Sequence, residues 1–67
     1  MDWRKRIVVD PKIQVGKPVI RGTRLTVELM LQMIAVGCTT REILDNYPGI
    51  TEDDLRACVA YAAETVT

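Results

Sequence analysis

The sequence predicts a mainly α-helical domain, in which a basic β-arm over residues 1–26 precedes a three-helix bundle over residues 27–64. Three observations support this fold class. Short runs of β-branched residues stop near residue 26, and the spacing of apolar residues then becomes helical. Two helix-start signals follow further along the chain. Because the chain has 67 residues, we expect one small domain.

The arm contains three short β-type runs. The first, at residues 7–9, is Ile-Val-Val and is closed by Asp-Pro. The runs at 18–20 and 24–26 are separated by Arg21-Gly22-Thr23, in which Gly22 can supply a positive φ. We therefore expect a small hairpin or β-arm in which 18–20 faces 24–26, with Arg21 and Arg24 on either side of its tip.

The first helix is expected over residues 27–36, where Glu28 and Gln32 are the only polar residues. Its apolar side chains form two stripes, Val27, Met30, Leu31 and Ile34 on one side and Leu29, Met33 and Val36 on the other. A helix that is apolar on both flanks is buried on both flanks. We expect Leu29, Met33 and Val36 to contact a second copy or a partner. The alternative is that the arm and the later helices cover both stripes. Gly37 ends the helix as a C′ residue.

Two further helices follow at helix-turn-helix spacing. Thr39 and Glu42 form a capping box for the second helix, which must end near residue 46 or 47 because Pro48 follows. Thr51 caps the third, whose expected buried stripe is Leu55, Cys58, Val59 and Ala62. The first turn of this third helix is Glu-Asp-Asp, which a DNA duplex would repel. These two helices are therefore expected to form a tri-helical core, and reading of DNA by the third helix is the weaker alternative.

The charge of the chain is split between its two parts. Residues 1–24 carry seven basic and two acidic side chains, a net charge of +5, whereas residues 25–67 carry two basic and seven acidic ones, a net charge of −5. Such a chain attracts something negative or another copy of itself, which favours binding over chemistry. Enzyme function is not expected, because there is no histidine or serine and neither Cys38 nor Cys58 has a histidine base. No metal, cofactor or small-molecule substrate is expected.

The basic arm holds the candidate binding residues. Arg4, Lys5, Arg6 and Lys17 are candidates for nucleic-acid contacts, with ordinary solvated charges as the alternative. Arg21, Gly22, Thr23 and Arg24 are the candidates for partner binding, because the guanidinium fork binds carboxylate or phosphate bidentately. The same arginines could instead hold the arm against the acidic helices. Trp3 is expected to pack over the core rather than to serve as an exposed anchor.

Three segments resemble a known family. They are Gly-Lys-Pro-Val-Ile-Arg-Gly-Thr-Arg-Leu-Thr-Val at 16–27, Ile-Leu-Asp-Asn-Tyr-Pro-Gly-Ile-Thr at 43–51 and Ala-Tyr-Ala-Ala-Glu at 60–64. The chain resembles the small prokaryotic domain of unknown function 433 family from about Ile7 to Glu64. The resemblance implies a homeodomain-like helical fold behind a β-arm. It also implies an antitoxin whose partner is a PIN-like toxin, which is a metal-dependent ribonuclease with clustered carboxylates. Such antitoxins often bind their own operator DNA.

From this we expect a non-enzymatic antitoxin that occludes a PIN-like toxin through Arg21 and Arg24 and that also regulates its own operon. Two alternatives stay open, a DNA-binding transcriptional regulator and a structural homo-oligomeric module. A homo-oligomer is expected when no partner is present. The N-terminus does not read as a signal peptide, and no apolar run reaches the ~18 residues of a membrane span. A cytoplasmic location without membrane attachment is therefore expected.

Overall fold

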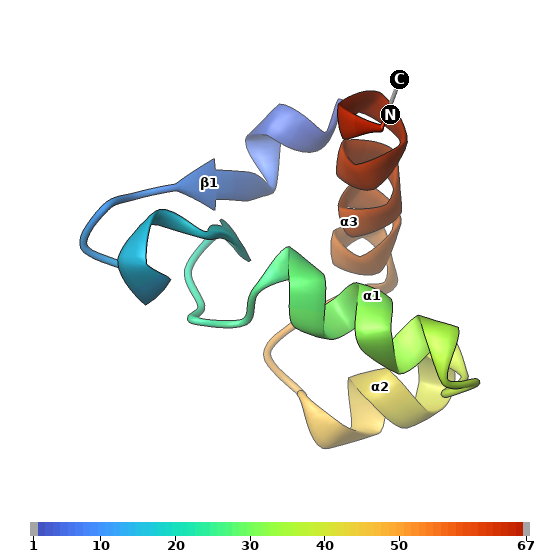
Figure 1. Ribbon diagram of the computed structural model, residues 1–67. Coiled ribbons are helices and arrows are strands. Elements are labelled where there is room, and N and C mark those ends of the chain that lie inside the picture. Colours follow the sequence, from blue (N-terminus) through green and yellow to red (C-terminus); the bar gives the residue numbers. More distant parts are fainter. Residues whose placement is uncertain (1, 67) are drawn as a thin grey trace.

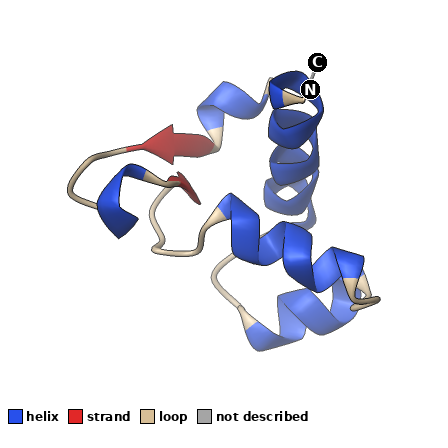
Figure 2. Cartoon of the chain, in the orientation of Figure 1, coloured by secondary structure: helices blue, strands red, loops and turns tan. Residues whose placement is uncertain are grey.

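The computed structural model describes residues 2–66, and its elements form a short β-arm followed by three helices (Figure 1). In chain order they are η1 (Trp3–Lys5), β1 (Ile7–Val9), η2 (Gln14–Gly16), β2 (Pro18–Ile20), α1 (Val27–Ala35), α2 (Thr40–Asn46) and α3 (Glu52–Thr65). The helices make up most of the regular structure, as Figure 2 shows. The predicted mainly helical class with an N-terminal arm is therefore confirmed.

The strand pairing differs from the expected one. β1 pairs with β2 in antiparallel register, with Ile7 opposite Ile20 and Val9 opposite Pro18. Residues 24–26 join β2 only through a bridge between Val19 and Thr26 and a hydrogen bond from Ile20 N to Leu25 O of 2.9 Å. The reason lies at Thr26, whose side chain caps α1 by accepting a bond from Leu29 N. The chain must leave the sheet there to begin the helix, so 24–26 cannot extend into a strand.

The helix boundaries follow the signals in the sequence. Thr39 and Glu42 form the expected capping box of α2, and Thr51 caps α3. At the end of α1, Gly37 has φ +98°, and Cys38 N donates to Met33 O at 3.0 Å while Gly37 N donates to Ile34 O at 3.1 Å. This pair of bonds is the Schellman motif, which satisfies the last carbonyls of the helix.

One apolar core joins the arm to the helices. Its buried side chains come from the sheet, the three helices and the turn between α2 and α3, namely Ile7, Ile20, Val27, Met30, Ile43, Ile50, Leu55, Ala57 and Cys58. α3 contacts both α1 and α2, and in Figure 1 it stands across them while the arm extends to the other side of the molecule. The connection between β1 and β2 therefore lies away from the helices, whereas the turn after β2 begins beside Arg6.

Candidate partner-binding surface

Two arginines of the arm are neutralised by α3. The Arg6 guanidinium lies 3.1 Å from an Asp54 carboxylate oxygen and 3.7 Å from one of Asp53. Arg4 lies 3.3 Å from Glu64 near the other end of the same helix. The opposite charges of the two halves of the chain thus pair within the fold. The predicted nucleic-acid contacts of Arg4 and Arg6 stay predictions, but these side chains already have carboxylate partners.

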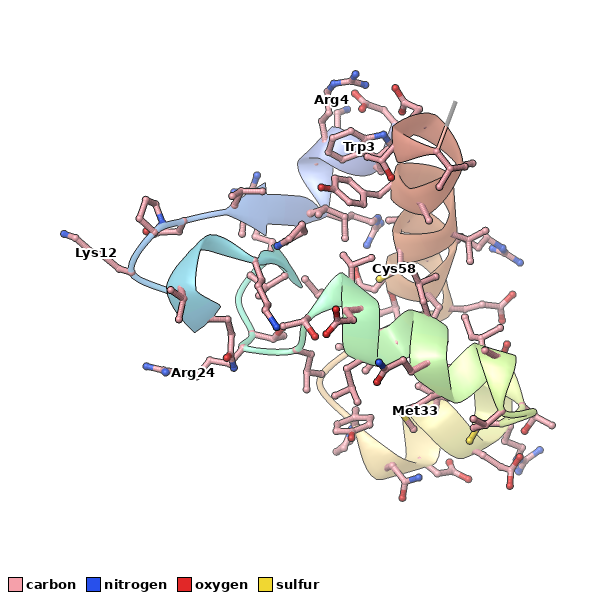
Figure 3. All side chains as sticks on the ribbon, viewed as in Figure 1. Trp3, Arg4, Lys12, Arg24, Met33 and Cys58 are labelled. Carbon is pink, nitrogen blue, oxygen red and sulfur yellow. The ribbon has the colours of Figure 1, made fainter. Side chains whose placement is uncertain are left out.

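Trp3 fixes the start of the arm on α3. Its ring is half-buried and meets Tyr61 edge-to-face, with centroids 4.8 Å apart and planes at 87°. The indole nitrogen donates to Glu64, and the guanidinium carbon of Arg4 lies 4.7 Å from the centre of the indole. Figure 3 shows Trp3 and Arg4 together against the C-terminal part of α3. Trp3 therefore packs on the fold, as expected from the sequence.

The other two predicted nucleic-acid residues lie apart from these. Lys5 is exposed, and its carbonyl oxygen accepts a hydrogen bond from Arg21 Nε at 2.9 Å. The Lys17 ammonium lies 3.6 Å from Glu28 at the start of α1. Because both side chains of that pair are more than half exposed, the pair contributes little stability. Arg4, Lys5, Arg6 and Lys17 do not form one basic patch.

The predicted partner-binding residues form a hydrogen-bonded turn. Thr23 N donates to Ile20 O at 3.0 Å, which closes a β-turn with Gly22 at its third position. Gly22 has φ +81°, the conformation that a type II turn requires there. The Thr23 hydroxyl donates to Ile20 O at 2.8 Å and accepts from Leu25 N at 3.0 Å. Gly22 and Thr23 therefore shape the turn.

The two arginines that flank this turn have different roles. Arg21 is tied to the beginning of β1, because its main-chain N donates to Arg6 O at 2.7 Å in addition to its side-chain bond to Lys5. Arg24 is exposed, and among residues 2–66 it takes part in no ion pair. Figure 3 shows Arg24 and Lys12 extending away from the helices at the far end of the arm. Arg24 is thus the free cation of the predicted site.

A second turn beside Arg24 was not predicted. Gln14, Val15 and Gly16 have successive φ values of +48°, +56° and +81°, so the η2 segment is a left-handed turn. Each non-glycine residue in this conformation costs roughly 1–2 kcal/mol, and a β-branched residue is the least suited to it. The Gln14 side-chain amide donates to Arg24 O at 3.0 Å and connects the two turns. In the sequence, Gly16 was the only residue that indicated this turn.

The apolar surface of α1 differs from the predicted one. Leu29 and Met33 are half-buried and pack against the core, whereas Val36 is 80% exposed. In Figure 3, Met33 lies on the side of α1 toward α2. The contact of Leu29 and Met33 with the core therefore covers part of the flank that we assigned to self-association. The sequence alone did not reveal this, because the burial of each flank depends on how the other elements pack around α1.

An open apolar groove lies where α1 ends. It has a volume of about 250 Å³ and is lined by Ile34, Thr40, Glu52, Leu55, Arg56 and Val59. Val59 is 49% exposed there, so its assignment to the buried stripe of the third helix is wrong. The physical reason is that α1 stops at Ala35 and turns at Gly37, which leaves this part of α3 uncovered. Ile34 and Val59 therefore join Val36 as exposed apolar side chains.

The remaining reactive groups are held in structural roles. Arg56 pairs with Glu52 and lies 3.0 Å from Asp53, within the acidic first turn of α3. Burial, and then the nearby Asp54 charge, raise the pKa of the Cys58 thiol to about 11, so it stays protonated at neutral pH. Within residues 2–66, no three histidine, cysteine, aspartate or glutamate side chains gather as a metal site would require. None of the helices described is long and apolar enough to cross a membrane.

The segments that form the turn, the core and the helix ends also match known proteins. A family model described as a protein of unknown function, DUF433, matches residues 7–62. The chain belongs to the DUF433 family. The predicted resemblance is confirmed at this level, and the match covers nearly the range expected from the sequence.

Two relatives extend this comparison. The crystal structure of a DUF433 member protein from Anabaena variabilis has a TM-score of 0.84 and 34% sequence identity, over 88% of this chain and 58% of that one. The present DUF433 chain thus spans little more than half the length of that relative. An uncharacterized protein of Archaeoglobus fulgidus is 62% identical over 24 residues, which are 36% of this chain and 67% of that protein.

Proposed function

We propose that this DUF433 protein is a non-enzymatic antitoxin that binds and inhibits a PIN-like ribonuclease. The observation that carries the proposal is the free guanidinium of Arg24, on a turn whose backbone is fixed by Gly22 and Thr23. A fixed turn presents its side chain at little further cost in conformational entropy, which favours tight binding. The family resemblance supports the same assignment, because it implies a toxin partner.

The proposed mechanism is occlusion of the carboxylates that a PIN-like toxin uses to hold its divalent ion. A guanidinium fork binds a carboxylate through two parallel hydrogen bonds, and it carries a full positive charge at any physiological pH. Bound at the carboxylates of the toxin, Arg24 would compete with the metal ion for them and would also block the approach of RNA. Arg21 is a second candidate contact, because its bond to Lys5 uses only Nε and leaves its terminal nitrogens for a partner.

DNA binding receives less support from the positions of the charges. The first turn of α3 carries Glu52, Asp53 and Asp54, and Arg56 is paired with two of them. Acidic side chains in the first turn stabilise the helix, because they lie at the positive end of its dipole, but DNA phosphates repel them. The homeodomain-like arrangement of the helices and the binding of operator DNA therefore stay predictions, and the tip of the arm is a better candidate for such contacts than α3.

The test is a titration of a cognate PIN-like nuclease with wild-type and variant chains. We expect Arg24→Ala to remain folded by circular dichroism and to lose affinity, and Arg21→Ala to lose less. Truncation of one member of a desolvated charge pair typically costs about 2–5 kcal/mol, which is a loss of about 30-fold to several thousand-fold. Arg24→Lys should rescue only part of the affinity, because lysine cannot bind bidentately.

The matched control is Arg41→Ala, since Arg41 is also exposed and, among residues 2–66, forms no ion pair. It lies on α2, away from the arm, and should leave inhibition unchanged. A folded Arg21/Arg24 double-alanine protein that inhibits the nuclease at wild-type affinity would refute the occlusion mechanism. A nuclease that does not bind the wild-type protein would refute the antitoxin function itself.

A further inference from the structure

The left-handed turn at the end of the arm holds an apolar side chain in solvent. Val15 has φ +56° and ψ +38°, and it is 93% exposed, more than any other large apolar side chain of residues 2–66. A buried apolar side chain can offset a strained backbone, but Val15 gains no such burial in this fold. Strained residues that persist without a benefit to the free protein are typical of binding sites.

The turn is held by specific bonds. Gly16 N donates to Ile13 O at 3.0 Å and Lys17 N donates to Gln14 O at 3.1 Å, which close it on itself. The Gln14 side chain then binds the Arg24 carbonyl at 3.0 Å. Val15 and the free Arg24 guanidinium are therefore carried by two linked turns at the same end of the molecule, where Lys12 also extends into solvent (Figure 3).

The charges close to Val15 along the chain are mainly positive, and they are bordered by Asp10, whose carboxylate accepts a bond from Lys12 N at 2.9 Å, and by Glu28. Residues 11–27 contain four basic side chains and no acidic one. Lys17 is paired with Glu28, and Arg21 is bonded to the main chain of β1. Lys12 and Arg24 form no ion pair among the residues that the structure describes. A partner surface that complements this end of the arm would have an apolar hollow for Val15 and carboxylates at the rim of that hollow.

We propose that Val15 is a preformed apolar anchor, inserted into such a hollow beside the carboxylates that Arg24 binds. This inference rests on the proposed function, because the occupant to which it commits is the same PIN-like nuclease. A protein is favoured over a nucleic acid because an isolated valine is a poor stacking partner for bases and because the cations at this end without a carboxylate partner are few. Since the turn is already formed, no ordering of the arm opposes binding.

The test compares Val15→Asn, Val15→Ile and Val66→Asn in the full chain, by thermal unfolding and by titration of the same nuclease. Asparagine tolerates the left-handed conformation, so Val15→Asn should raise Tm by about 4–8 °C. It should also weaken nuclease binding about 10- to 100-fold, because the buried apolar contact is lost. Val15→Ile keeps an apolar side chain and should bind within a few-fold of the wild type. Val66 is 81% exposed with φ −99°, so Val66→Asn should change neither quantity.

The outcomes separate this inference from the proposed function. If Arg24→Ala weakens nuclease binding but Val15→Asn does not, the antitoxin function stands and the anchor is refuted. If the wild-type chain does not bind the nuclease, both are refuted. A short random-sequence DNA duplex is titrated in parallel with the same variants. Loss of DNA binding alone in Val15→Asn would identify the turn as a nucleic-acid contact and would also refute the proposed anchor.

Discussion

Replacement of Trp3 by alanine tests whether the arm is a fixed part of the fold. The edge-to-face contact with Tyr61 at 4.8 Å is worth about 0.5–1.5 kcal/mol, and the exposed contact of Arg4 over the indole about 0.5–1 kcal/mol. The hydrogen bond to Glu64 adds about 0.5–1.5 kcal/mol. The free energy of unfolding should therefore fall by about 2–4 kcal/mol in Trp3→Ala. A core of this size rarely supplies more than about 3–5 kcal/mol, so the variant should be close to unfolding.

The assay is urea denaturation followed by circular dichroism, because the substitution removes the only tryptophan. With a slope near 1 kcal/mol per molar urea, the midpoint should fall by about 2 M or more. Trp3→Phe retains an aromatic ring against Tyr61 and loses the indole N–H, so it should lose only about 1 kcal/mol. A midpoint for Trp3→Ala within about 0.5 M of the wild type would refute the argument. The arm would then be a mobile appendage, and its charges would be free for other contacts.

Two further predictions concern the thiols and self-association. Because burial raises the pKa of the Cys58 thiol to about 11, iodoacetamide at mildly alkaline pH should modify only Cys38 in the folded protein. In urea both thiols should react, and the intact mass reports the number of adducts. Two adducts on the folded chain would contradict the burial of Cys58. At micromolar concentration the protein should form a homodimer or larger assembly by sedimentation equilibrium, and Val59→Asp or Val36→Asp should weaken it, because these exposed side chains lie where α1 ends. A clean monomer mass for the wild type would remove the prediction.

The helices could be predicted from the sequence because their ends are encoded locally. The unpaired backbone groups at the helix ends are satisfied by residues only a few positions away, namely Thr39 with Glu42 for α2, Thr51 for α3 and Gly37 for the end of α1. These signals can therefore be identified without tertiary information. The apolar spacing then identified buried residues such as Met30 and Cys58.

The strand pairing and the surfaces could not be predicted in the same way. Residues 24–26 have the composition of a strand, but Thr26 is needed as the cap of α1, and that competition is settled only by the packed helix. Val59 fits a helical apolar stripe, but the stripe is covered only as far as α1 extends. The left-handed conformation of Val15 opposes its intrinsic preference, so no propensity argument leads to it. Sequence reasoning fails here where the fold departs from local rules, and such departures are typical of binding sites.

The split of charge along the chain has a different meaning in the folded protein. Three of the seven cations of the basic arm, Arg4, Arg6 and Lys17, lie near carboxylates of the acidic helices. Near the left-handed turn, Lys12 and Arg24 form no ion pair among the residues that the structure describes. Figure 3 shows both side chains pointing away from the helices. Pairing of this kind reduces the long-range attraction of the arm to DNA. Such an arrangement favours a local, shape-dependent contact with a protein.

The end of the arm and the groove beside Ile34 and Val59 lie on different parts of the molecule. The groove is formed where α1 stops, whereas the arm extends from the opposite side of that helix in Figure 1. A contact between two copies through the groove would therefore leave Val15 and Arg24 accessible on each copy. If both proposed surfaces are used, each copy in a homodimer can bind one nuclease, and two linked binding ends would raise the avidity for a dimeric nuclease without any new contact.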